Sequence, residues 1–238
     1  LSSFVATLIL YVIMLLASTW GMLIFLGIRF YRSMYTDEGY LSHTLPVTAN
    51  QLFLSKVLVS GVWYLFITIG IGISVVALIV SLMTGLLNIG ELSGVLTQYN
   101  GNIWEFLADA FYELGRTYEE EMGINLLHYG ITLLLTYVAG PFIAMVTLFG
   151  ALTIGQLSSK HKGFMGILVY AGVTILSSII GSTVQSAFMF GANVANSASG
   201  ITVSTNSAYD INVITSLLLA AIMYGVSYYI MNRKLNLD

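Results

Sequence analysis

The chain has 238 residues, of which 57% are hydrophobic and only 8% are charged, and its net charge is −3. A soluble domain carries about 25% charged residues, so this composition excludes a soluble globular protein, which needs a more polar surface. There is no cysteine, which excludes disulfide bonds and thiolate metal sites.

Five apolar stretches along the chain are each long enough to cross a membrane. A helix of about 20 residues spans the roughly 30 Å of hydrocarbon in a bilayer. The stretches are continuously apolar, which favours helices over the alternating strands of a β-barrel. The sequence therefore predicts an all-α membrane protein, a polytopic helical bundle that forms one transmembrane domain over residues 1–238. The expected spans are residues 4–28, 52–87, 126–157, 164–190 and 211–231.

The basic residues predict the orientation of these spans. Lys and Arg concentrate in the cytoplasmic loops of membrane proteins, so we expect the loop 29–51, residues 158–163 and the C-terminus to be cytoplasmic. Residues 88–125, which are rich in acids, and residues 191–210 are then external loops. Leu1 falls outside, and a further span upstream would give six. The basic clusters are Arg29, Arg32 and Lys56; Lys160 and Lys162; and Arg233 and Lys234.

The first external loop contains an amphipathic pattern. Asn102 followed by Glu105 is typical of a helix start, and apolar residues then recur at helical spacing opposite a face of acids. We expect a helix that lies on the membrane or packs on the outer ends of the spans; a gate that contacts substrate is the alternative. The second loop, 191–210, is rich in Gly, Ser, Asn and Thr and is expected to be a solvated connector, with an extended excursion as the alternative.

Catalytic and metal-binding motifs are not found in the sequence. His43, His128 and His161 are too far apart in sequence for a metal-ligand pair. The glycines of 150–155 have phosphate-loop spacing, but Gln156 and Leu157 stand where Lys and Ser or Thr are needed. Apart from Lys56 near the start of the second span, the spans carry no Asp, Glu, Lys or Arg, which weighs against a proton-coupled transporter.

Mildly polar side chains remain within the spans. They can form hydrogen bonds between helices, which is the commoner role, or line a translocation path. The candidates are Thr153, Gln156, Ser178 and Gln185.

The loop between the first two spans has the most specific local pattern. Thr36 can cap a short helix with two acids in its first turn. Pro46 ends that helix, because the residue before a proline avoids the helical conformation. Thr48 and Gln51 form a capping box that starts the next span.

This loop resembles that of the permease subunits of type-2 ATP-binding-cassette exporters. The matching tracts are Asp37-Glu38-Gly39-Tyr40-Leu41, Thr44-Leu45-Pro46-Val47, Gln51-Leu52 and Ser55-Lys56, with a weaker likeness from Gly155-Gln156-Leu157 to Lys162. In that family the loop holds a coupling helix that docks on the ATPase. The chain departs from the family pattern in lacking a first span and in placing its long outer loop before the fourth span of six.

The resemblance implies a bacterial plasma-membrane exporter whose catalysis lies elsewhere. ATP and Mg would be bound by a separate cytoplasmic ATPase subunit, so no cofactor and no catalytic residue are expected in this chain. A second permease subunit, identical or different, and the lipid bilayer are the other expected partners, and no nucleic acid is expected. A membrane-embedded enzyme or an ATPase-independent integral membrane protein is the alternative. The ATPase-docking candidates are Glu38, Tyr40, Leu41, His43, Leu45 and Pro46.

Overall fold

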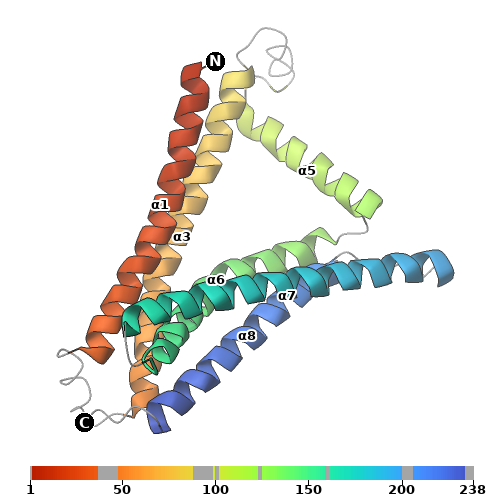
Figure 1. The fold of residues 1–238 in the computed structure, drawn as a ribbon. Helices are drawn as coiled ribbons and strands as arrows, with labels where there is room; N and C mark the ends of the chain where they lie inside the picture. Colours follow the sequence, from red (N-terminus) through yellow and green to blue (C-terminus); the bar gives the residue numbers. More distant parts are fainter. Residues whose placement is uncertain are drawn as a thin grey trace.

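The expected all-α architecture is confirmed by a computed structural model, which describes residues 2–36, 48–87, 99, 102–122, 125–158, 161–199 and 206–233 (Figure 1). Within these residues the regular structure is helical throughout, and five helices are long and apolar enough to cross a membrane. The helices are α1 (Ser2–Tyr35), α3 (Ala49–Leu87), α5 (Ile103–Met122), α6 (Leu126–Gly155), α7 (Lys162–Ser199) and α8 (Asn206–Arg233).

Several helices extend beyond the expected spans. At about 1.5 Å of rise per residue, α1, α3 and α7, with 34, 39 and 38 residues, are each more than about 50 Å long. They must therefore tilt or project from the hydrocarbon layer. The continuation of α7 to Ser199 corrects the expected loop 191–210, whose first residues are helical. The Ala, Asn and Ser residues there disfavour a helix only weakly, and no proline interrupts it.

The starts of three helices are fixed by side-chain caps. At α3 the expected capping box is present: the Thr48 N–H donates to Gln51 Oε1 at 3.1 Å, and the Gln51 N–H donates to Thr48 Oγ1 at 3.3 Å. Asn102 caps α5 by accepting from the N–H of Trp104 at 3.2 Å, and Asn125 caps α6. Each cap satisfies a backbone donor that has no partner within its helix.

The five long helices form two groups that meet at one end of the molecule. Figure 1 shows α1 and α3 running side by side, and α6, α7 and α8 diverging from them, while α5 lies across the open side. Helix α6 contacts each of the other five helices. It continues through Pro141, whose missing N–H leaves the carbonyl of Tyr137 without its usual helical donor.

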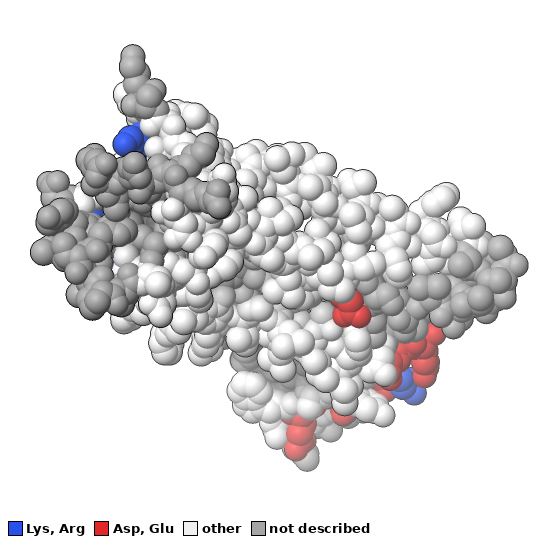
Figure 2. Space-filling view, turned by 90° about the horizontal axis from the view of Figure 1, so that it is seen from below, with Lys and Arg blue, Asp and Glu red and all other residues white. Residues whose placement is uncertain are grey.

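Among the described residues, charges of opposite sign lie at opposite ends of the bundle. The basic end is where α1 and α8 finish and α3 and α7 begin, and the acidic end is where α6 and α8 begin and α5 lies (Figure 2). Arg116 is the exception, and it forms ion pairs of 3.2 and 3.8 Å with Glu113 and Glu120 on its own helix. The described residues that define the basic end are Arg29, Arg32, Lys56, Lys162 and Arg233.

Glycines allow α6 and α7 to approach closely at the basic end. A methyl group added to Gly155 would lie 2.5 Å from Cα of Gly166 and 2.9 Å from the carbonyl oxygen of Lys162. These neighbours are backbone atoms, so they cannot move aside as a flexible side chain can. Small residues at helix contacts are the main means by which membrane helices pack closely.

We predict opposite effects for two Gly→Ala substitutions. Gly155→Ala should lower the free energy of unfolding by about 1–3 kcal/mol because it overpacks a filled contact. Gly172→Ala in α7, where the new methyl group would meet nothing within 4 Å, should leave stability unchanged or raise it by up to about 1 kcal/mol. Unfolding in mixed detergent micelles measures both, and equal destabilisation by the two changes would contradict the close contact.

Candidate functional site

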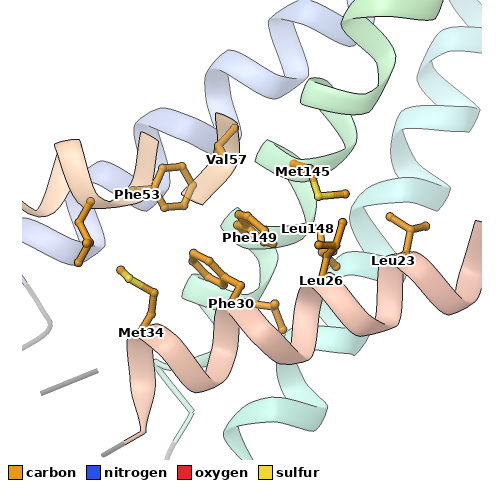
Figure 3. Close-up of a cluster of buried hydrophobic side chains, with 11 residues drawn as sticks. Leu23, Leu26, Phe30, Met34, Phe53, Val57, Met145, Leu148 and Phe149 are labelled. Carbon is orange, nitrogen blue, oxygen red and sulfur yellow. The ribbon is translucent and has the colours of Figure 1, made fainter. Parts of the chain in front are cut away.

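Three phenylalanines lock three helices together at the basic end. Phe30 of α1 stacks on Phe149 of α6 with ring centroids 4.0 Å apart and planes 5° from parallel. Phe53 of α3 meets Phe30 edge-on at 6.0 Å. All three side chains are buried, and Met34, Val57, Met145 and Leu148 surround them (Figure 3). We call these seven residues the aromatic core.

Hydrogen bonds between helices reinforce this core. The hydroxyls of Tyr35 in α1 and Thr153 in α6 are 2.8 Å apart. Thr153 donates its own proton to the carbonyl of Phe149 at 2.8 Å, so Tyr35 is the donor between them. Tyr224 of α8 donates to Asn50 at the start of α3. The basic end of the bundle is thus tied across α1, α3, α6 and α8.

The polar candidates from the sequence are not brought together. Thr153 is buried in the helix contact just described. Gln156 is half-buried, and its side-chain amide donates to the carbonyl of Leu152 at 3.3 Å. Ser178 is exposed and Gln185 is half-buried, both on α7. The docking candidates Glu38, Tyr40, Leu41, His43, Leu45 and Pro46 lie outside the described residues.

Helix ends flank the docking candidates on both sides. Helix α1 ends at Tyr35, and the hydroxyl of Thr36 donates to the carbonyl of Arg32 at 2.6 Å. Helix α3 begins at Ala49 behind its capping box. Both helix ends lead directly into the aromatic core, so the intervening loop leaves from a packed base and returns to it.

A cavity of about 670 Å³ lies between α3, α6 and α8, with Thr19 of α1 also in its wall, on the acidic side of the aromatic core. Binding sites for small molecules have volumes of about 300–1,000 Å³. Most of the surface that faces the cavity is apolar, although more than half of the lining residues carry a hydroxyl or an amide. The polar lining residues are Thr19, Tyr64, Thr68, Tyr129, Thr132, Thr136, Tyr137, Tyr209, Asn212 and Ser216.

A carboxylate adjoins this cavity at the acidic end. Asp210 of α8 lies 2.9 and 3.1 Å from Nε2 of His128 in α6. It also accepts a hydrogen bond of 3.1 Å from the hydroxyl of Thr132, which lines the cavity. The pair joins the starts of α6 and α8 and is partly exposed. Across the described part of the chain, no three His, Asp or Glu side chains are grouped to hold a metal ion.

The cavity was not identified from the sequence, although α6 carries a signal for it. Tyr129, Thr132, Thr136 and Tyr137 recur at helical spacing within an otherwise apolar span, which places them on one face. The pairing of His128 with Asp210, 82 positions apart, has no local signal.

The expected amphipathic helix is present as α5. Its Phe106 and Leu107 are half-buried, whereas Phe111 and Leu114 of the same apolar face are 72% and 55% exposed. The described residues therefore cover only part of that face. At the start of α5, a hydrogen bond to Asp109 raises the pKa of Tyr99 above its ordinary value, because the carboxylate accepts the phenolic proton.

Comparison with known proteins adds no relationship: no protein family, no curated protein and no solved structure matches this chain.

Proposed function

We propose that this chain is the membrane-spanning permease subunit of an ATP-binding-cassette exporter in a bacterial plasma membrane. ATP hydrolysis takes place on a separate cytoplasmic subunit, and two permease subunits form the path. The observation that carries the proposal is the loop 37–47, whose sequence resembles that family's coupling loop and whose two ends are anchored in one packed core.

The aromatic core gives the loop a mechanical role in this proposal. A loop that leaves α1 and enters α3 at a rigid base transmits the movement of a docked partner to both helices. Phe149 extends that connection to α6, which lines the cavity further along its length. Coupling between a docked partner and the cavity requires packed elements that can adopt two arrangements. It does not require one particular chain of contacting residues between the two places.

The charge distribution supports the orientation. The basic end carries the loop, the start of α7 and the end of α8, and the positive-inside rule assigns that end to the cytoplasm. The C-terminus is then cytoplasmic, and the cavity lies toward the outer half of the membrane, on the same side as α5.

We predict that labelling of single cysteines will follow this orientation. The chain has no cysteine of its own, so a single introduced thiol gives an unambiguous signal. In intact cells a membrane-impermeant maleimide should label Glu113→Cys in α5 but not Ser42→Cys in the loop, and permeabilisation should expose Ser42→Cys. The opposite pattern would invert the bundle and would remove the loop from the reach of a cytoplasmic ATPase.

Docking is tested by changing the apolar residues of the loop. Replacing Tyr40 and Leu41 together with Ser should release a co-purifying ATPase and uncouple its hydrolysis from export, because apolar anchors contribute much of the energy of such interfaces. Tyr112→Ser, an exposed tyrosine on α5, is the matched control and should change neither. Absence of an ATPase from the wild-type complex, or coupling that survives the double change, would favour an ATPase-independent membrane protein or a different docking site.

A further inference from the structure

The cavity between α3, α6 and α8 has more hydrogen-bond acceptors than donors. A threonine or serine hydroxyl has one proton and two lone pairs. Four cavity hydroxyls donate that proton to a carbonyl of their own helix at 2.7–2.9 Å, so only their lone pairs remain for a ligand. These residues are Thr19, Thr68, Thr136 and Ser216.

Three further groups add to this excess of acceptors. Tyr137 donates its phenolic proton to the carbonyl of Thr68, and Thr132 donates to Asp210. The backbone carbonyl of Tyr137 lacks its usual donor because residue 141 is proline. Tyr64, Tyr129, Tyr209 and Asn212 can both donate and accept. None of the described lining residues carries only donors, since none is Lys or Arg.

Aromatic rings and a carboxylate favour positive charge in the same place. Tyr129 and Tyr209 meet edge-on at 5.0 Å in the cavity wall, and the face of a tyrosine ring attracts an ammonium group. Asp210 lies next to them and accepts a hydrogen bond from the hydroxyl of Thr132 in the cavity wall. The described Lys and Arg side chains are at the opposite end of the bundle or, for Arg116, paired with acids, and His128 is paired with Asp210.

We propose that the cavity binds an organic ammonium compound: an apolar or aromatic body with a protonated amine whose N–H groups point to the acceptors. The claim that such a compound is the transported substrate rests on the proposed function, whereas the claim that the cavity binds it does not. The volume of about 670 Å³ accommodates a body of drug size, and the Tyr129–Tyr209 pair places the charged group toward the acidic end.

Binding can be measured on the full chain in lipid nanodiscs, with any subunit that co-purifies, by titration calorimetry against empty nanodiscs. The probe is 1-naphthylmethylammonium. Its N,N,N-trimethyl analogue keeps the charge without donors, 1-naphthylmethanol removes the charge, and 1-naphthoate reverses it. We expect saturable binding of the ammonium, about 10-fold tighter than either the trimethyl analogue or the alcohol, and no binding of the carboxylate.

A variant that removes acceptors tests the geometry. Thr136→Val combined with Ser216→Ala preserves the shape of the cavity, so it should weaken ammonium binding about 10-fold and abolish the preference over the trimethyl analogue. Thr183→Val is the control, because Thr183 makes the same bond to its own helix, to Ile179 at 2.7 Å, on the exposed face of α7. It should bind as the wild type does.

Three results would overturn the proposal. They are a binding heat that depends only on the amount of lipid, equal affinity for the ammonium and the alcohol, and a double variant that still prefers the ammonium to its trimethyl analogue. The first would show a cavity filled by lipid. The binding measurement requires no ATPase. If it fails, the proposed function is still tested separately by the docking experiment, and if the docking experiment fails, the binding of ammonium compounds is unaffected.

Discussion

The aromatic core is the packed contact at which α1, α3 and α6 meet, because Phe30 of α1 stacks on Phe149 of α6 and meets Phe53 of α3 edge-on. Lipid tails are as apolar as the side chains that face them, so membrane helices gain little by hiding apolar surface from water. Close packing and hydrogen bonds must supply the association instead. Both are present at the basic end, where the aromatic core, the Tyr35–Thr153 bond and the Gly155–Gly166 approach lie.

A bundle fastened mainly at one end has a consequence for the other end. Beyond the aromatic core the two helix groups diverge, and the hydroxyl-lined cavity lies on that side (Figure 1). There α6 also contacts its neighbours, through interactions that include the His128–Asp210 pair, the Tyr129–Tyr209 ring contact and the bond from Tyr137 to Thr68. A partner that moves the packed base would change the distance between the groups at the acidic end, which is the property that the proposed transport role requires.

The sequence predicted the features that depend on local patterns. Continuous apolar runs identified the five spans, and the Thr48–Gln51 box marked the start of α3, because both signals act within one helix. The stacking of Phe30 on Phe149 and the pairing of His128 with Asp210 depend on helices that are far apart in sequence, so no local pattern indicates them. The end of α7 was placed too early because Ala, Asn and Ser disfavour a helix only weakly. The loop 37–47 lies outside the described residues, so the docking assignments stay predictions.

Stability of the Phe149→Ala variant is the measurement that tests the role of the aromatic core most directly. Phe149 is fully buried, whereas Phe66 on α3 is 64% exposed, so Phe66→Ala is a matched control. Unfolding in mixed detergent micelles should show a loss of about 3–5 kcal/mol for Phe149→Ala, the usual cost of emptying a packed site. The exposed change should stay within about 0.5 kcal/mol. Equal effects of the two substitutions would show that the bundle is not held at the aromatic core.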